Sequence, residues 1–320
     1  MKRAFSALAL LATLLLAGCN GTSSEDISGS LSSDISTSSE SVSETSNEPL
    51  HEVPTSDTTP AADYVGAGAD AYYASIADVD ILSGSNLAAA LRAKGRAVFH
   101  GLTYTEAIDP IAIMDEDQND VGNVIGVYSR NRIPTARRQT NPFTQRENYW
   151  NREHCYPQSK LKDGDESLGA DAHKANISSD IANLFAEDVV VNETRSNNSF
   201  GDLDTSVEKF FIVDSLGKTT DTYSWMGYVE PTDIAKGEVA RANLYMILMY
   251  PENCALTENG PIETFLEWNL AFPPNVERDV LRNQTIFEYQ HNRNPFIDDP
   301  DFGCRIWGDT NALTRQVCGL

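Results

Sequence analysis

The sequence has few basic residues and only one long apolar run. That run lies near the N-terminus, which excludes a membrane protein with several spans. The 320 residues include 24 Lys and Arg against 47 Asp and Glu, a formal net charge of −23. Nucleic-acid-binding domains are commonly basic, so the charge of the whole chain argues against that class. A hydrophobic content of 41% excludes a wholly disordered chain and is sufficient for a large core.

The N-terminal apolar run has the layout of a bacterial export signal. It follows two basic residues, extends over residues 7–17 and is too short to cross a bilayer. Its end, Leu-Ala-Gly-Cys, resembles a lipobox and implies removal of residues 1–18 and lipidation of Cys19. The alternative is an ordinary signal peptide in which Cys19 is incidental. Because Asn20 is not the aspartate that retains lipoproteins at the inner membrane, we expect an outer-membrane lipoprotein, with a secreted protein as the alternative.

Residues 19–62 differ in composition from the rest of the chain. Ser and Thr dominate from residue 20, Lys and Arg are absent, and eight carboxylates are scattered between Glu25 and Asp57. Such a segment buries too little apolar surface to fold, so we expect a disordered tether. Residues 63–320 show no internal repeat and are expected to form one monomeric domain. This domain is still acidic, with 22 basic and 39 acidic side chains.

Four cysteines follow Cys19, an even number that suits an oxidising compartment. Three pairings of the four are possible. We favour Cys304–Cys318, which closes a short loop and leaves Cys155–Cys254 as the second pair. A zinc site is the alternative, but no two of the four have the spacing of a C-x₂-C motif.

The hydrophobic pattern predicts a helix-rich α+β domain. Helical spacing is found at residues 86–96, 264–271 and 276–289, and a strongly apolar helix, expected to be buried, at 237–250. Residues 123–129 are typical of a strand. The βαβ alternation of a parallel sheet is missing, which favours α+β over α/β.

One segment departs from the acidic character of the domain. Residues 129–152 contain six Arg and a single acidic residue, Glu147, a local charge of +5. Arg suits bidentate phosphate contacts, so we expect Arg137, Arg138 and Arg152 to bind phosphate. The alternative is a solvated loop whose arginines pair with the acidic surface.

The Glu153–His154 pair that follows supplies groups for phosphodiester hydrolysis. That reaction needs a base for water, a divalent metal at the phosphate oxygens and cations on the phosphate. His154 can be neutral at neutral pH and accept the proton of the water. Glu153 and Asn192 offer the hard oxygen ligands that Mg²⁺ prefers, with Mn²⁺ or Ca²⁺ as possible substitutes.

Five ordered segments point to a known family: residues 151–159 (NREHCYPQS), 180–184 (DIANL), 191–197 (VNETRSN), 237–241 (GEVAR) and 292–298 (NRNPFID). The first three resemble the motifs N-R-E-H-x-x-P-x-S, D-L-H-N-L and V-N-x-x-R-S-N of the bacterial endonuclease I family. This family is a branch of the ββα-metal, or His-Me finger, nucleases. The resemblance covers about residues 90–300 and implies a ββα-metal core.

The resemblance assigns the roles that the chemistry also suggests. His154 would be the general base, Glu153 and Asn192 the metal ligands, and Arg195 a phosphate contact. It implies an exported endonuclease that cleaves DNA, with RNA as a second expected substrate and with little sequence specificity. Because neighbours on a strand point to opposite faces, Glu153 and His154 are expected at a strand end, bend or bulge. Asn192 is expected on a helix over residues 186–196.

Two positions depart from the family pattern. Ala182 stands where the second motif has histidine, and Asp299 where the family often has histidine. His173 could replace the missing imidazole, although a surface histidine is the simpler interpretation. The competing hypotheses are a catalytically weak nucleic-acid-binding or adhesive lipoprotein that keeps the fold, and a phosphatase or nucleotidase that acts on small substrates.

Overall fold

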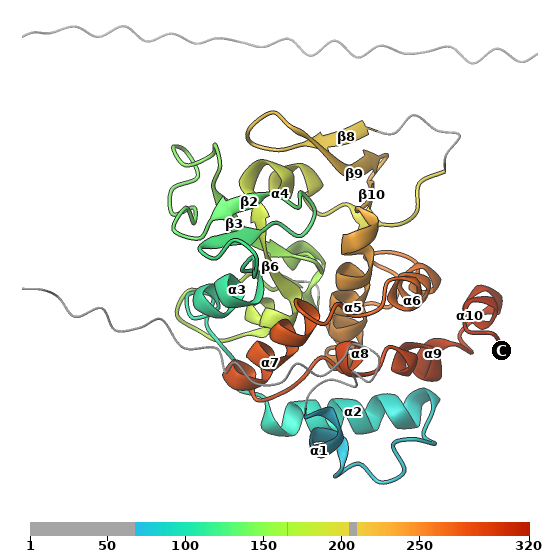
Figure 1. Cartoon of the computed structure of the whole chain (residues 1–320). Coiled ribbons are helices and arrows are strands. Elements are labelled where there is room, and N and C mark those ends of the chain that lie inside the picture. Colours follow the sequence, from blue (N-terminus) through green and yellow to red (C-terminus); the bar gives the residue numbers. More distant parts are fainter. Residues whose placement is uncertain (1–67, 165, 205–209) are drawn as a thin grey trace, which may run out of the picture. The chain divides into compact units, whose positions relative to one another are not determined.

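The structure is a computed structural model that describes residues 68–164, 166–204 and 210–320. Helices and short strands are mixed along the chain, which confirms the predicted α+β class (Figure 1). Within these ranges no helix is both long and apolar enough to cross a membrane. The predicted signal peptide, the lipidation of Cys19 and the tether up to residue 62 lie outside the described residues and stay predictions.

Helices occupy both ends of the described chain. The first part contains α1 (Ala69–Tyr73), α2 (Gly84–Val98), α3 (Ile108–Met114) and, later, α4 (Val189–Arg195). The second part contains α5 (Asp233–Met249), α6 (Ile262–Ala271), α7 (Asp279–Gln290), α8 (Pro295–Asp298), α9 (Asp301–Trp307) and α10 (Ala312–Val317). The four helices predicted from hydrophobic spacing correspond to α2, α5, α6 and α7.

Helix α5 is the buried helix that the sequence predicts. Every residue from 235 to 249 is buried, and α2 and α6 both pack against it. Its contact with the end of α6 is close, because a Cβ at Gly237 would stand 2.2 Å from the carbonyl oxygen of Phe272. Glycine is therefore required where these two helices meet.

Two strands and a helix form the expected ββα unit. Strand β3 (Trp150–His154) pairs antiparallel with β6 (Leu184–Asp188), and α4 follows β6 directly (Figure 1). The prediction that the helix begins at residue 186 is wrong, because residues 186–188 belong to the strand. Asp188 ends the strand and begins the helix, since its side chain accepts hydrogen bonds from the N–H groups of Val190 and Val191.

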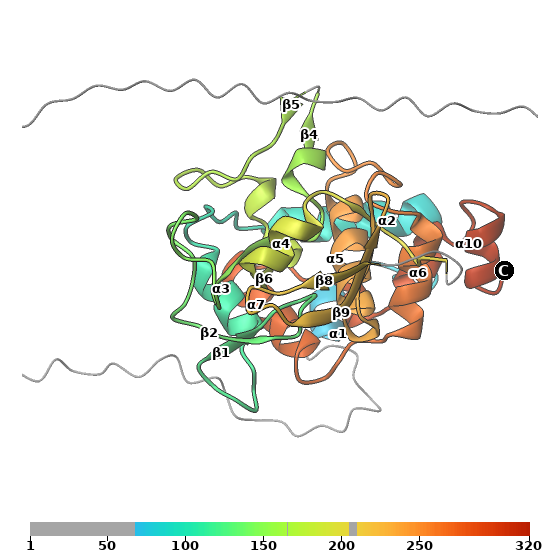
Figure 2. The same cartoon turned by 90° about the horizontal axis from the view of Figure 1, so that it is seen from above.

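A four-stranded sheet lies beside this unit. Its strand order is β7 (Ser199–Phe200), β10 (Tyr228–Glu230), β9 (Thr219–Trp225) and β8 (Phe210–Val213), with only the β7–β10 pair parallel. Figure 2 shows β8 and β9 running beside α4, with which β8 makes contact. Phe200, Ile212 and Val229 are buried on the inner face. A separate short hairpin joins β4 (Lys162–Asp163) to β5 (Glu166–Ser167).

The strand predicted over residues 123–129 is shorter than expected. Strand β1 (Asn123–Ile125) pairs with β2 (Arg132–Pro134), and the chain turns inward from Gly126. The backbone N–H groups of Tyr128 and Ser129 donate to the buried carboxylate of Glu187 instead of to a neighbouring strand. A side-chain acceptor distant in sequence thus ends the strand.

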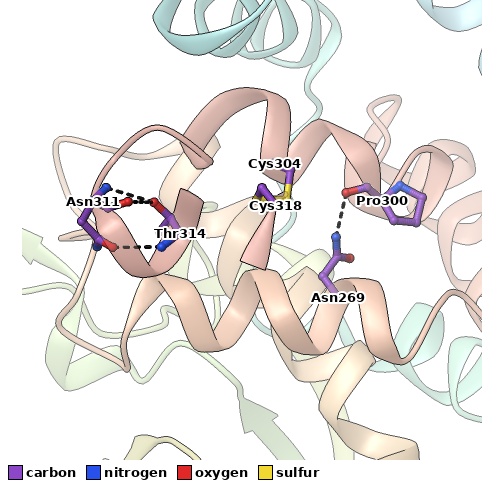
Figure 3. Close-up of a disulfide and its surroundings, with 6 residues drawn as sticks. All are labelled: Asn269, Pro300, Cys304, Asn311, Thr314 and Cys318. Carbon is purple, nitrogen blue, oxygen red and sulfur yellow. Dashed lines mark hydrogen bonds between the residues drawn. A yellow bond between two sulfur atoms is a disulfide. The ribbon is translucent and has the colours of Figure 1, made fainter. Parts of the chain in front are cut away.

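The cysteine prediction is half right. Cys304 and Cys318 form a disulfide that ties α9 to the end of α10, close to the Asn311 capping box (Figure 3). The predicted Cys155–Cys254 pair is wrong, since both thiols are free and buried.

Local geometry explains the failed pairing. The Cys155 sulfur lies 3.6 Å from the hydroxyl of Tyr128. Cys254 instead precedes Ala255, whose carbonyl oxygen accepts a hydrogen bond from the Tyr156 hydroxyl. The two thiols therefore have different neighbours, Tyr128 for Cys155 and the Tyr156–Ala255 contact for Cys254.

Candidate active site

A pocket of about 350 Å³ opens where β3 ends beside α4. Its lining includes all four residues that the sequence motifs assign to chemistry: Glu153, His154, Asn192 and Arg195. The first two come from the last two positions of β3, Asn192 from the middle of α4, and Arg195 from its last position. The pair thus lies at a strand end, one of the three positions expected for it. The antiparallel β3–β6 pairing and the short step into α4 bring these distant segments together.

The Glu153 carboxylate is buried and held from behind. Its Oε1 accepts a hydrogen bond of 2.8 Å from the Tyr128 hydroxyl and lies 3.0 Å from Nη1 of Arg195. Burial raises the pKa of this carboxyl, while Arg195 and Tyr128 oppose the rise. Both contacts reach Oε1, so Oε2 is the oxygen available to a ligand in the pocket.

The ring of His154 is fixed in one tautomer. Its Nε2 lies 2.8 Å from the carbonyl oxygen of Ser178, which can only accept, so Nε2 carries the proton. The basic nitrogen is therefore Nδ1, to which the side-chain amide of Gln158 donates at 3.2 Å. Burial lowers the pKa of His154 to about 4, so the imidazole is neutral at neutral pH, as a general base must be. Its ring stacks on Tyr104, with centroids 5.6 Å apart.

The Asn192 amide is oriented by β3. Its Nδ2 donates to Oδ1 of Asn151 at 2.7 Å and to the carbonyl oxygen of Arg152 at 3.3 Å. With the amide nitrogen occupied on the strand side, Oδ1 is the atom left for a ligand. Asn192 lies in the middle of α4, one turn after the Asp188 cap that sets the start of this helix.

Oxygen donors of this kind suit Mg²⁺ better than a softer metal. In the described ranges no group of three or more His, Cys, Asp and Glu side chains is arranged to hold a metal ion. One carboxylate and one amide oxygen are enough for Mg²⁺, which keeps several of its own waters. The preoriented Glu153 and Asn192 therefore fit a weakly ligated, hydrated divalent ion.

Arg195 lies beneath the pocket and is fully buried. Its terminal nitrogens donate to the carbonyl oxygens of His154 and Cys155 at 3.0 and 2.8 Å, besides the ion pair with Glu153. The guanidinium also lies over the ring of Phe200. These contacts hold Arg195 against the end of β3, and its predicted phosphate contact stays a prediction.

The arginine-rich segment is less positive in space than in sequence. Three of its six arginines form ion pairs with carboxylates from other segments: Arg130 with Glu238, Arg132 with Asp117, and Arg146 with Glu193. Half of its arginines are therefore paired with carboxylates, as the alternative interpretation expects, and phosphate binding by the other half stays a prediction.

The remaining three arginines are those expected to bind phosphate. Arg137, Arg138 and Arg152 form no ion pair with a carboxylate in the described part of the chain. The Arg152 guanidinium lies 3.4 Å from the ring centroid of Tyr104. Burial lowers the pKa of Arg152, and the nearby charge of Arg138 lowers it further. Tyr104 thus contacts both the histidine and an uncompensated cation.

Several residues of the site could not be found from the motifs. Tyr104 and Tyr128 lie outside all five segments, and Gln158 occupies a variable position of the first. Ser178 contributes only a backbone carbonyl, which leaves no sequence signal. The aromatic residues near the arginines were the nearest hint, but nothing in the sequence indicates that Tyr104 stacks on the histidine.

The departures from the family pattern lie away from the pocket. Ala182 is buried in the core, and His173 lies in an exposed turn whose N–H donates to Asp171. His173 therefore does not replace the missing imidazole. Asp299 accepts a hydrogen bond from the N–H of Asp301 at the start of α9.

Comparisons with known proteins identify the family. Residues 84–301 match the model of the family described as Endonuclease I. An extracellular ribonuclease of Bacillus subtilis (strain 168) is 33% identical over 222 residues, 64% of this chain and 69% of the relative. An extracellular ribonuclease of Bacillus amyloliquefaciens is 30% identical over 64% of this chain and 68% of its own length. An endonuclease-1 of Buchnera aphidicola subsp. Acyrthosiphon pisum (strain APS) is 29% identical over 42% of this chain and 51% of its own length.

Proposed function

The chain belongs to the endonuclease I family and is an enzyme that hydrolyses nucleic acids, and from this premise we propose a metal-dependent endonuclease of low sequence specificity. DNA is the expected substrate, and the relatives named ribonucleases favour RNA as a second one. The observation that carries the proposal is the meeting of Glu153, His154 and Asn192 in one pocket, with each side chain oriented by partners outside it.

We assign a divalent ion, Mg²⁺ in the first instance, to Glu153 and Asn192. When bound, this ion acts as a Lewis acid on the phosphate oxygens. The protein contributes the orientation of its two ligands. Tyr128 and Arg195 hold the Glu153 carboxylate, and Asn151 holds the Asn192 amide. Mn²⁺ and Ca²⁺ are possible substitutes because they accept the same oxygen donors.

His154 is proposed to take the proton of the attacking water at Nδ1. The Ser178 carbonyl holds the opposite ring nitrogen and stabilises the imidazolium that forms. Gln158 currently donates to Nδ1, so its amide must give way to the water. The stacked Tyr104 restricts rotation of the ring and excludes solvent from one of its faces.

Arg152 and Arg138 are proposed to bind the phosphates on the Tyr104 side of the pocket, with Arg137 further out. Their charges are not cancelled by ion pairs within the described ranges. Arg152 is held by its stacking on Tyr104 and by a hydrogen bond to the Tyr104 carbonyl oxygen. A preoriented guanidinium suits bidentate contact with phosphate.

Export follows from the N-terminal signal, and the relatives named extracellular ribonucleases support it. The finer proposal is a lipid anchor on Cys19 that places a monomeric enzyme at the outer membrane. Metabolic labelling with a fatty acid tests this anchor, because Cys19→Ala must abolish labelling of a lipoprotein.

Plasmid nicking in Mg²⁺ and in EDTA tests the catalytic proposal. We expect nicking with Mg²⁺, none with EDTA, and loss of activity in His154→Ala, with His173→Ala as the matched surface-histidine control. Full activity of His154→Ala, or nicking that resists EDTA, would contradict the mechanism. Competition separates a small-substrate phosphatase from an endonuclease, since mononucleotides must not compete as well as polymer. Binding without any turnover would favour the adhesive lipoprotein.

A further inference from the structure

The outer face of the four-stranded sheet carries a cluster of exposed aromatic side chains. Phe211 and Tyr228 expose 51% and 45% of their surface, and Trp225 is partly exposed. The rings contact one another across the strands. The ring centroids of Phe211 and Tyr223 are 4.7 Å apart, and Phe210 stacks on Trp225 with centroids 5.7 Å apart and ring planes at 20°. Phe210 is the register partner of Ser224 and so starts from the other side of the sheet, although its ring reaches Trp225. We call the other four residues, Phe211, Tyr223, Trp225 and Tyr228, the aromatic face.

The strand register places the aromatic face in line with the edge strand β7. Tyr228 is the register partner of Trp225 on one side and of Ser199 on the other. Register partners point to the same face of a sheet, so Ser199, Tyr228 and Trp225 form one row across three strands. Phe200 and Val229, the next residues along, are buried on the opposite face.

A lysine stands at the β7 end of this row. The ammonium of Lys160 donates to Oγ of Ser199 at 2.9 Å and to Oδ1 of Asn259 at 3.0 Å. Glu258 is near enough to act on the charge, but no carboxylate in the described ranges forms an ion pair with Lys160. One cation at the head of a row of aromatic rings is the composition of a surface that binds single-stranded nucleic acid.

The row is continuous with the active-site pocket. Lys160 directly follows Ser159, which lines the pocket, and both belong to the short turn Gln158–Lys160. Asn197 also lines the pocket and donates to Oγ of Ser159, and β7 begins two residues later. A polymer that leaves the pocket across Ser159 and Asn197 therefore reaches Lys160 first and Tyr228 next.

We propose that the aromatic face binds unpaired bases of a single-stranded nucleic acid whose backbone occupies the active-site pocket. Lys160 contacts a phosphate at the edge of the pocket, and Tyr228 and Trp225 stack on the bases that follow. The inference rests on the proposed function, because the pocket must hold the polymer. It adds a second binding region besides the arginines at Tyr104. A duplex keeps its bases paired and inside, so the aromatic face favours single strands over duplexes.

Binding of a short oligo(dT) to the full-length protein in EDTA tests the proposal without catalysis. Trp225→Ala and Tyr228→Ala are expected to weaken binding at least about fivefold each, since stacking on one aromatic side chain contributes this much. Phe287→Ala is the matched control, because Phe287 is a 44% exposed aromatic on α7, outside the sheet. An abasic oligonucleotide of equal length is expected to bind the protein and the two sheet variants equally. Lys160→Ala must weaken both ligands alike, because it removes a phosphate contact.

Tryptophan fluorescence gives a second readout that does not depend on removing a side chain. Of the four tryptophans, Trp150 and Trp268 are buried, with 1% and 2% exposure, and the partly exposed Trp307 lies on α9, outside the sheet, stacked on Phe296. Quenching by oligo(dT) is therefore expected to come mainly from Trp225, with Trp307 as an internal reference that the ligand does not reach. Trp225→Phe is expected to abolish most of the quenching and to retain most of the affinity.

The outcomes separate this proposal from the one on which it rests. Unchanged oligo(dT) binding in both alanine variants, or equal loss for the abasic ligand, overturns the aromatic face as a base-stacking site. Loss of binding to phospholipid vesicles, with oligo(dT) binding intact, also overturns it and assigns the face to a membrane. Quenching together with a failure to nick plasmid leaves the aromatic face standing and refutes the catalytic proposal. Preferential loss of cleavage of single-stranded over duplex substrate in Tyr228→Ala supports both.

Discussion

Replacing Tyr128 by Phe tests how the metal ligand Glu153 is held. The change removes the hydroxyl that donates to Oε1 at 2.8 Å and keeps the fully buried ring. A hydrogen bond to a charged group contributes about 1.5–3 kcal/mol, and loss of such an outer contact typically costs about 10–100-fold in metal affinity. Arg195 still holds the same oxygen, so we expect the lower end, an increase of about tenfold in the Mg²⁺ concentration for half-maximal activity.

The assay is nicking rate against Mg²⁺ concentration for the wild type and the variant. At saturating Mg²⁺ the rate of Tyr128→Phe should return to nearly that of the wild type, because His154 and its partners are untouched. Tyr156→Phe is the matched control, since this buried hydroxyl contacts the Ala255 carbonyl instead of the site. An unchanged Mg²⁺ dependence, or a reduced rate that metal does not restore, would refute the reasoning.

Three further predictions concern charge and pH. Replacing both Arg137 and Arg138 by Ala should weaken nucleic-acid binding and leave the metal requirement unchanged. The slope of the logarithm of the binding constant against the logarithm of salt concentration should become shallower by about two. An unaltered slope in a binding titration rejects the phosphate contacts. Burial raises the pKa of Glu187 from 4.5 to about 7. The folded protein therefore loses stability as the pH rises through this range, and its free energy of unfolding falls by on the order of 3 kcal/mol. Thermal melts of Glu187→Gln should show a flatter dependence across this range, and an equal dependence counts against the buried carboxyl. Arg195→Lys should reduce activity and stability together, because a lysine cannot replace the fork that joins Glu153 to two carbonyl oxygens; activity near that of the wild type would show that Arg195 does not position the site.

The acidic composition was a poor guide to function, and the structure shows why. Carboxylates from other segments neutralise Arg130, Arg132 and Arg146, so the +5 segment does not act as one patch. Some of the carboxylates of the domain therefore form ion pairs with arginines of this segment, and a count of charges along the chain cannot reveal this. What remains for phosphate is a smaller group, Arg137, Arg138 and Arg152, selected by the absence of ion pairs in the described part of the chain.

Local patterns located the elements better than their boundaries. The apolar run of α5 was unmistakable, because a helix buried on all sides needs no polar face. The run from Leu184 to Val191 is equally compatible with strand and helix, and the Asp188 cap decides where one becomes the other. Strand β1 is shorter than predicted because the chain turns at Gly126 and the N–H of Tyr128 donates to Glu187. Glu187 is distant in sequence, so no local pattern predicts this strand end.

The sequence by itself determined the family, the fold class and the three residues proposed for catalysis, because ordered motifs preserve residue type and spacing. Only the tertiary structure decided what holds those residues. The β3–β6 pairing brings Arg195 under Glu153, the loop after β1 brings Tyr128 to the same oxygen, and Ser178 sets the tautomer of His154. Hydrogen bonds and ion pairs act over a few ångströms, and which distant residues come that close depends on chain topology. The motifs therefore name the reacting groups, and the fold determines their orientation.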